Sequence, residues 1–305
     1  MAFHVPEPFE ELYDQVVDRF RMLLRRGVVT GITPIGLDRW LNNFASDQDR
    51  YLAARLLENL TFRSERMVAS AIAHLCECLL PCELRRLNIG KFQDVDQFVE
   101  SLESGGADHP VRFVAVDGAF DDTPGKSGAV IIREFQRHGP ISKSLTCKPE
   151  SLGASPASVR CLVFVDDMLG TGTQFTKFEK HYNLRALQPA KHLMYCPLVA
   201  HEKGLAKLKK DFPWLSVLPV EQFGTEHQFY RPLEDDAKTW AIDGSNVVDD
   251  VRLYVKQLCA LHQIPATTHH SLSLLLGFQH ATPNNTLPIL YAKSSTWQNL
   301  LIRQT

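Results

Sequence analysis

The sequence has too few cysteines for a disulfide scaffold, because only seven are scattered over 305 residues. It also lacks an uncharged apolar run near the roughly 20 residues that a membrane span requires. The N-terminal segment MAFHVPEPFEELYDQ does not have the basic and then apolar layout of a signal peptide. We therefore expect a cytoplasmic protein with free thiols and no membrane association.

An excess of charge of one sign is also missing. The chain has 33 Lys and Arg against 35 Asp and Glu, which gives a formal net charge of -2. Direct nucleic-acid binding is therefore not indicated, since it usually comes with a basic field. With 44% hydrophobic and 22% charged residues, the composition is that of an ordinary globular protein.

Residues 1–108 are predicted to form an N-terminal helical region. Apolar residues recur at helical spacing from Phe9 to Phe20. Ser46 and Asp49 have the spacing of a capping box at the start of a second helix. A third helix is expected to begin near Ser64 and to end at Pro81.

Residues 109–225 change to short apolar runs that alternate with helical segments. Such alternation predicts an α/β core with a parallel, Rossmann-like sheet and helices on its faces. Residues 226–305 form a separate C-terminal extension, with a helix near 247–262 and a turn between two strand-like runs over 277–293. The four predicted core strands are VRFVAV (111–116), LVFV (162–165), HLMYCPLV (192–199) and LSVLPV (215–220).

The segment LVFVDDMLGTGTQF (162–175) is the most informative part of the chain. Asp166 and Asp167 follow a buried run, at the end of a strand where parallel sheets bind ligands. Gly170 and Gly172 allow a tight turn that points backbone amides inward. A helix starting near Thr173 favours an anion at its N-terminus. The segment thus combines carboxylates for sugar hydroxyls with a cradle for a phosphate.

This segment resembles the signature of type I phosphoribosyltransferases: four hydrophobic residues, two acids, two hydrophobic residues and a Thr-Gly loop. The resemblance implies that Asp166 and Asp167 hold the ribose hydroxyls of phosphoribosyl pyrophosphate and lie near Mg²⁺ only indirectly. It assigns the 5′-phosphate to the loop, and Gln174 replaces the last hydroxyl of the family pattern. A purely structural strand–turn–helix is the alternative. The residues assigned to the phosphate are Gly170, Thr171, Gly172, Thr173 and Gln174.

A second glycine-containing loop follows the first core strand. In the family this loop receives pyrophosphate, and PGKSG fits that role, although a plain helix start explains it equally well. The Pro/Ser/Gly-rich segment 138–158 takes the position of the family's mobile catalytic loop, with Lys143 and Lys148 as basic side chains. The residues of the pyrophosphate loop are Gly125, Lys126, Ser127 and Gly128.

The tail TPNNTLPILYAK (282–293) resembles the end of a divergent branch, the phosphoribosyltransferase-like proteins of bacterial conflict and anti-phage systems, including retron-associated ones. This branch implies a defence effector whose N-terminal helices contact a protein partner. Asn284 and Asn285 have donors and acceptors suited to a base edge, so a hood-like extension would use them to bind substrate. The alternative is a hairpin turn.

Other polar clusters have ordinary explanations. His74, Cys76, Cys78 and Cys82 lie on one predicted helix, where buried cysteines are favoured over a zinc site. His201 follows the third core strand and could line the crevice.

Two functions stay open. One is an enzyme that acts at ribose C1 of phosphoribosyl pyrophosphate or a nucleotide, by transfer or hydrolysis. The other is a non-catalytic module that senses a nucleotide or binds a partner.

Overall fold

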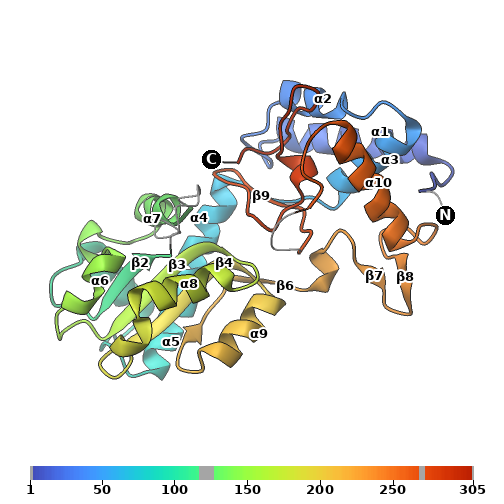
Figure 1. The fold of residues 1–305 in the computed structure, drawn as a ribbon. Helices are drawn as coiled ribbons and strands as arrows, with labels where there is room; N and C mark the ends of the chain where they lie inside the picture. Colours follow the sequence, from blue (N-terminus) through green and yellow to red (C-terminus); the bar gives the residue numbers. More distant parts are fainter. Residues whose placement is uncertain (1–2, 117–126, 268–271, 304–305) are drawn as a thin grey trace. The chain divides into compact units, whose positions relative to one another are not determined.

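The computed structural model describes residues 3–116, 127–267 and 272–303 (Figure 1). The chain forms two compact units. The first unit combines residues Met1–Glu65 with Gly224–Arg303, and the second comprises Arg66–Phe223. Residues 66–108, expected with the N-terminal helices, thus belong to the unit that contains the sheet. The chain leaves the second unit after Phe223, close to the boundary expected at residue 225. The three-part division as such stays a prediction.

The first unit is mainly helical and draws on both ends of the sequence. Its strands are short: β1 pairs in parallel with β9, and β7 pairs with β8 antiparallel. The helices are α1 (Phe9–Arg25), α2 (Pro34–Leu41), α3 (Asp47–Glu58) and α10 (Val248–Leu261). The strands are β1 (Thr61–Arg63), β7 (Pro232–Leu233), β8 (Asp236–Trp240) and β9 (Leu276–Phe278).

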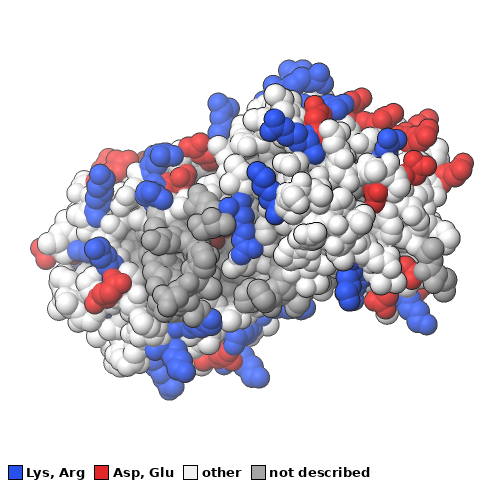
Figure 2. Space-filling model, turned by 45° about the horizontal axis from the view of Figure 1, so that its top comes forward, with Lys and Arg blue, Asp and Glu red and all other residues white. Residues whose placement is uncertain are grey.

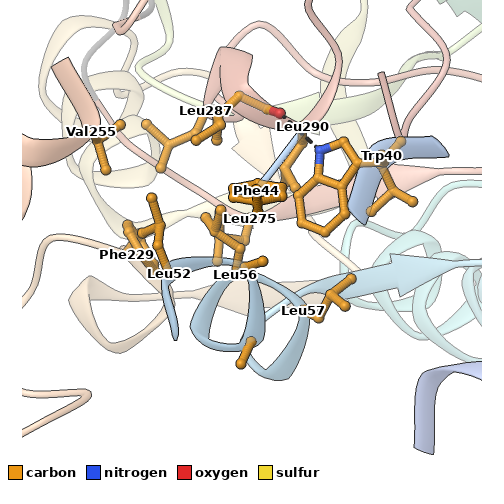
Figure 3. Close-up of a cluster of buried hydrophobic side chains, with 14 of the residues drawn as sticks. Trp40, Phe44, Leu52, Leu56, Leu57, Phe229, Val255, Leu275, Leu287 and Leu290 are labelled. Atoms are coloured by element: carbon orange, nitrogen blue, oxygen red, sulfur yellow. Dashed lines mark hydrogen bonds between the residues drawn. The ribbon is translucent and has the colours of Figure 1, made fainter. Parts of the chain in front are cut away.

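One hydrophobic core joins the distant segments of the first unit (Figure 3). The Trp40 indole N–H donates to the Ile289 carbonyl oxygen at 3.1 Å, so the ring's polar atom is satisfied inside the core. The predicted capping box is present at α3: Ser46 Oγ accepts from the Asp49 N–H at 3.1 Å, and Asp49 Oδ2 accepts from the Ser46 N–H at 2.9 Å.

The C-terminal run differs from the expected pair of strands. β9 forms, but Pro288–Leu290 is a turn of 3-10 helix. Pro288 has no N–H to donate to a strand ladder, which explains why the second strand is absent.

The second unit contains the predicted parallel sheet. Its strands run in the order β2-β3-β4-β5, and β6 also pairs with β4. All these pairings are parallel, so the expected α/β fold class is confirmed. The strands are β2 (Val111–Ala115), β3 (Cys161–Leu169), β4 (His192–His201), β5 (Ser216–Val217) and β6 (Glu221–Phe223).

Helices cover both faces of this sheet (Figure 1). On one face, α8 (Thr173–Tyr182) packs Phe175 and Phe178 against Phe164 of β3, and α9 (Glu202–Asp211) adds Leu208 to the same cluster. On the other face, α7 (Ser127–His138) packs against β2 and β3.

The connection from α7 to β3 passes around the free edge of β2. Thr146 forms a parallel bridge with Phe113, and the Cys147 N–H donates to the Phe113 carbonyl at 2.9 Å. The chain then contributes Leu152 to the cluster under α8. Segment 138–158, expected as a long loop, is therefore attached to the sheet edge and contains two short 3-10 helices, Lys143–Leu145 and Pro149–Ala154.

A long helix from Glu65 to Arg86 covers the same face of the sheet as α7. It consists of α4 (Glu65–His74), a π-helical turn (Leu75–Leu79) and α5 (Leu80–Arg86). The expected stop at Pro81 is wrong, since the helix continues through it. The π turn ends at Leu79, two residues before Pro81, where it accommodates the missing proline N–H. A further helix, α6 (Val95–Ser104), follows.

This long helix is apolar and long enough to cross a membrane by length and composition alone. Its Ile72, Leu75, Cys76 and Leu80 side chains are buried in the protein. Burial and the neighbouring thiols of Cys161 and Cys76 raise the pKa of Cys196, which places Cys76 beside β3 and β4. The apolar residues therefore serve the core of the second unit.

Charged side chains of both signs are interspersed on the face drawn in Figure 2.

Candidate functional site

The two acids of the signature lie within β3 rather than after it. The last pairing of β2 joins Ala115 to Val165, so the strand from Asp166 to Leu169 runs on past the end of β2. On its other side, β3 stays paired with β4 as far as Ala200. The acids therefore occupy the extension of a central strand, next to the point where its neighbour ends.

Asp166 is held by protein groups at both carboxyl oxygens. The Tyr195 hydroxyl donates to Oδ2 at 2.9 Å, and the Asp167 backbone N–H donates to Oδ1 at 2.9 Å. Tyr195 comes from β4, and its ring stacks on Phe175 of α8 with centroids 4.5 Å apart. Asp166 is only 1% exposed, so it is an internal residue. The sequence did not identify Tyr195.

Asp166 and Asp167 also interact through their side chains. Neighbouring residues of a regular strand point to opposite faces. Here the Asp166 carboxyl instead turns along the strand to the Asp167 N–H, and a side-chain hydrogen bond links the two acids. The structure thus brings the two predicted residues together, although Asp167 is itself only 6% exposed.

The electrostatics of this pair follow from burial and proximity. Loss of solvent raises the pKa of Asp166 well above its usual value, and the Asp167 charge raises it further. The hydrogen bond from Tyr195 acts in the opposite direction but is the smaller effect. Burial next to Asp166 likewise raises the pKa of the Tyr195 hydroxyl.

The predicted phosphate loop joins β3 to α8. Gly172 has a φ of 79°, the left-handed conformation that glycine adopts without strain. The Thr171 and Thr173 hydroxyl oxygens lie 3.0 Å apart, and both side chains are partly exposed. No side chain of the described residues caps the first turn of α8. Its amide donors and two hydroxyls therefore meet at one place, which suits an anion.

Gln174, the departure from the family pattern, has a structural contact. Its Nε2 donates to the carbonyl oxygen of Val116, directly after β2, at 3.3 Å. The side chain therefore links the start of α8 to the end of the neighbouring strand. A serine or threonine at this position is too short to make the same link.

The backbone of α9 packs closely against the loop between β3 and α8. Gly204 of α9 lies so near Gly170 that a Cβ on residue 204 would overlap the Gly170 carbonyl oxygen and come within 2.8 Å of Leu169 Cγ. Gly204 was missed from the sequence. Its signal was a glycine inside a helix, which weakens a helix unless close packing requires it.

Only part of the predicted pyrophosphate loop can be placed. Gly125 and Lys126 lie outside the described residues. Ser127 and Gly128 are in the first turn of α7, on the face of the sheet opposite α8. The lysines of the following segment, Lys143 and Lys148, are exposed.

The predicted substrate residues Asn284 and Asn285 belong to the first unit, whereas the acids belong to the second. Asn284 Oδ1 accepts a hydrogen bond from Arg303. Asn285 is 8% exposed, and its Nδ2 has no hydrogen-bond partner among the described residues. The neighbouring Thr286 Oγ1 donates to the Leu276 carbonyl at 2.6 Å. This motif therefore has a structural role in its own unit, and substrate binding by the two asparagines stays a prediction.

The remaining clusters have structural roles. His201 is fully buried, and its Nδ1 accepts from the Lys203 N–H at 3.2 Å as the N-cap of α9. Cys76 is buried, while Cys78 and Cys82 are exposed. None of these cysteines joins a metal-binding group among the described residues.

A polar cleft of about 260 Å³ lies in the first unit. It contains none of the residues predicted from the sequence. Its half-buried Arg231 makes a 3.3 Å hydrogen bond to the Gln228 carbonyl, while Glu58 and Glu226 on the same walls have partners of their own. The lining residues are Glu58, Asn59, Leu60, Thr61, Glu226, His227, Phe229, Arg231 and Leu275.

Asp166 does not fit a directly bound Mg²⁺. Both oxygens of Asp166 already bind protein donors, and the residue is fully enclosed. Mg²⁺ in nucleotide sites commonly keeps waters and substrate phosphate oxygens as ligands. For Asp166 this geometry leaves room only for an indirect role, and the indirect contact of both acids with Mg²⁺ stays a prediction.

Comparison with known proteins gives one informative result. The family model described as PRTase-CE matches residues 37–303. A search of curated proteins gave no match. Among solved structures, the structure of the AQ2163 protein from Aquifex aeolicus is 12% identical, covers 63% of this chain and 85% of that chain, and has a TM-score of 0.30. A similarity this low does not establish a common fold.

Proposed function

Because the chain belongs to the PRTase-CE family, a phosphoribosyltransferase-like family, we propose that it binds phosphoribosyl pyrophosphate or a nucleotide at the end of β3 and acts at ribose C1. One observation carries this proposal. A hydrogen-bonded acid pair is followed, within one short loop, by two adjacent threonine hydroxyls and a helix start that no described side chain caps.

The loop would bind the 5′-phosphate. Backbone amides of the first turn of α8 provide donors, and the helix dipole adds partial positive charge. Thr171 and Thr173 supply hydroxyl donors at the same place. The acid pair, on the strand that leads into the loop, would then meet the ribose hydroxyls, since a carboxylate accepts two hydrogen bonds from a diol.

The reaction follows from this placement. The bond between ribose C1 and the leaving-group oxygen breaks, and its electron pair leaves with the diphosphate. An acceptor nitrogen or a water oxygen forms the new bond to C1 with its own lone pair, and the proton that it loses passes to the departing diphosphate or to solvent. A negative carboxyl pair next to the sugar stabilises the electron-poor C1 that develops in between. No described residue is needed as a covalent nucleophile.

The diphosphate would lie towards Gly125, Lys126, Ser127 and Gly128, in keeping with the family resemblance. Mg²⁺, when bound, supplies charge neutralisation to the departing diphosphate. Asp167 and Asp166 would contact it only through bound water or the ligand.

Isothermal titration with phosphoribosyl pyrophosphate and Mg²⁺ tests the site. We expect binding by the wild type and loss of at least 10-fold in affinity for the Asp166→Asn/Asp167→Asn variant, because a hydrogen bond to a charged group contributes about 1.5–3 kcal/mol. Asp96→Asn, at an exposed acid of α6, is the control and should bind like the wild type. Equal affinities for the double variant and the wild type would exclude this site.

A second function, sensing without turnover, has one observation in its favour. Segment 138–158 takes the position of the family's mobile catalytic loop, but it is attached to the edge of β2. Its basic side chains Lys143 and Lys148 are exposed to solvent. Chromatography of a nucleotide pool after incubation separates the two functions, because only an enzyme changes the nucleotides.

The tail motif supports a proposed setting for either function. Its resemblance to proteins of anti-phage systems suggests a defence effector that binds a protein partner through its N-terminal helices. Met22, Val28 and Ile35 expose apolar side chains in this region. Loss of phage protection and of partner co-purification after Ile35→Asp would support this setting, and unchanged protection and co-purification would argue against it.

A further inference from the structure

Helix α9 places a lysine side chain against the loop between β3 and α8. We infer that Lys207 is a counter-ion of the 5′-phosphate, and that its ammonium group leaves Asp211 for the phosphate when the ligand binds. This inference rests on the proposed function. It adds a charged residue from outside the signature segment and an exchange of ion-pair partners on binding.

The position of α9 next to this loop is fixed by close packing. A Cβ on Gly204 would lie 2.3 Å from the Gly170 carbonyl oxygen, so the backbone of the helix touches the loop at this point. Residues three and four positions apart share one face of a helix. Lys207 and Leu208 therefore face the same loop, one turn after Gly204.

The stem of Lys207 lies directly on the loop. A Cβ on Gly172 would approach Lys207 Cδ to 3.3 Å and Leu208 Cδ2 to 3.4 Å. Gly172 is the residue before α8, whose first turn has no cap from a described side chain. A lysine packs its methylene stem on protein and keeps its ammonium group in water. Rotation about the last bonds of the side chain would turn the ammonium group towards the first turn of α8.

Lys207 has a partner in the free protein that it can exchange at little cost. Its Nζ lies 2.5 Å from Oδ2 of Asp211, one turn further along α9. The two side chains are 37% and 33% exposed, and an ion pair that is open to water contributes little free energy. A phosphate gives the ammonium group a partner of higher charge, since it carries about 1.5–2 negative charges at neutral pH.

The charge of the loop also favours a contact with a lysine. The donors that the loop offers are neutral groups, namely the Thr171 and Thr173 hydroxyls and the backbone amides. The side-chain amide of Gln174 donates to the Val116 carbonyl at 3.3 Å. The helix dipole adds only about half a positive charge. An ammonium group beside the loop supplies the full positive charge that these groups lack.

Isothermal titration with phosphoribosyl pyrophosphate and Mg²⁺ tests the role of Lys207. We expect Lys207→Met to weaken binding about 3–10-fold, which is less than the effect of a buried charged hydrogen bond because the lysine is partly exposed. Lys207→Arg, which keeps the charge, should retain most of the affinity. Circular dichroism confirms that each variant is folded.

Lys209→Met is the matched control, because it removes the same charge from the same helix. Residue 209 is exposed and, two positions from Lys207, lies on the other side of α9. This variant should bind like the wild type. Competition with ribose 5-phosphate, which has the 5′-phosphate but no diphosphate, locates the contact. Its affinity should fall in Lys207→Met by the same factor as that of phosphoribosyl pyrophosphate.

Asp211→Asn separates an exchange of partners from a merely structural ion pair. Removal of the competing carboxylate should strengthen binding about 2–4-fold, as expected for one exposed ion pair. The gain should vanish in the Lys207→Met background, because it passes through the lysine. A structural ion pair predicts a loss or no change for Asp211→Asn.

Four results overturn the inference: unchanged binding by Lys207→Met, an equal loss in Lys209→Met, a loss in Lys207→Met that ribose 5-phosphate does not share, or an Asp211→Asn gain that is the same in both backgrounds. Lack of phosphoribosyl pyrophosphate binding by the wild type is a different outcome. It overturns the proposed function, and the inference with it.

Discussion

Tyr195 of β4 donates its hydroxyl hydrogen to Asp166 of β3 across 2.9 Å, inside the layer that α8 covers. The two residues are 29 positions apart in the sequence. Their contact joins two neighbouring strands at the point where the chain turns into the loop between β3 and α8. The stability of this part of the unit should therefore depend on one hydroxyl group.

Tyr195→Phe removes that hydroxyl and leaves the Asp166 oxygen without its buried donor. We expect the free energy of unfolding to fall by about 1–3 kcal/mol in the absence of ligand. Urea denaturation measures this. Tyr182→Phe, whose hydroxyl contact is exposed, should cost less than about 0.5 kcal/mol. Similar losses in the two variants would mean that the buried hydrogen bond contributes no more to the free energy of unfolding than the exposed one.

Asp166→Asn should change the pH dependence of stability. Burial raises the pKa of Asp166 in the folded state, so the native protein retains a proton that the unfolded chain releases near pH 4. The stability that this proton gives is complete below the unfolded pKa and is lost as pH rises through the folded pKa. Asparagine does not titrate, and the variant should therefore gain stability relative to the wild type between acid and neutral pH.

Thermal unfolding of both proteins across this range measures the effect. A difference between variant and wild type that stays constant with pH, or that shrinks as pH rises, would contradict the raised pKa. Asp96→Asn, which replaces an exposed acid of α6, serves as the control.

Gly204→Ala should destabilise the protein, since the new methyl group would overlap the Gly170 carbonyl oxygen and press on Leu169. Backbone cannot give way as a flexible side chain does, and overpacking of this kind costs about 1–3 kcal/mol. Gly153→Ala is the control, because a Cβ there meets nothing within 4 Å. Denaturant titration should show a loss only for residue 204, and a neutral Gly204→Ala would show that α9 can move away from the loop.

Thr286→Val tests the structural role of the tail motif. The hydroxyl is buried and donates to Leu276 in β9, so its loss leaves that carbonyl unsatisfied. We expect a loss of about 1–3 kcal/mol in stability. Thr296→Val, at an exposed position, should be close to neutral. If neither substitution changes the unfolding curve, the motif is not needed for the first unit to fold.

Much of the fold was readable from local sequence. The apolar runs at 111–116, 162–165 and 192–199 all became parallel strands, and the Ser46–Asp49 spacing became a capping box. These features depend on residues close together in the chain, where periodicity and side-chain chemistry act directly on the backbone. The strand, loop and helix of the β3–α8 segment were readable for the same reason.

Other features depended on contacts between distant segments. The sequence could not show that residues 224–303 pack with the first 65 residues, that Tyr195 lies against Asp166, or that Gly204 approaches Gly170. Nor did it show that Pro81 is accommodated by a π turn within a continuous helix. Local patterns determine which strands and helices form. Tertiary packing decides which of them meet and which polar groups lose their water, because these outcomes depend on the summed burial of residues far apart in the chain.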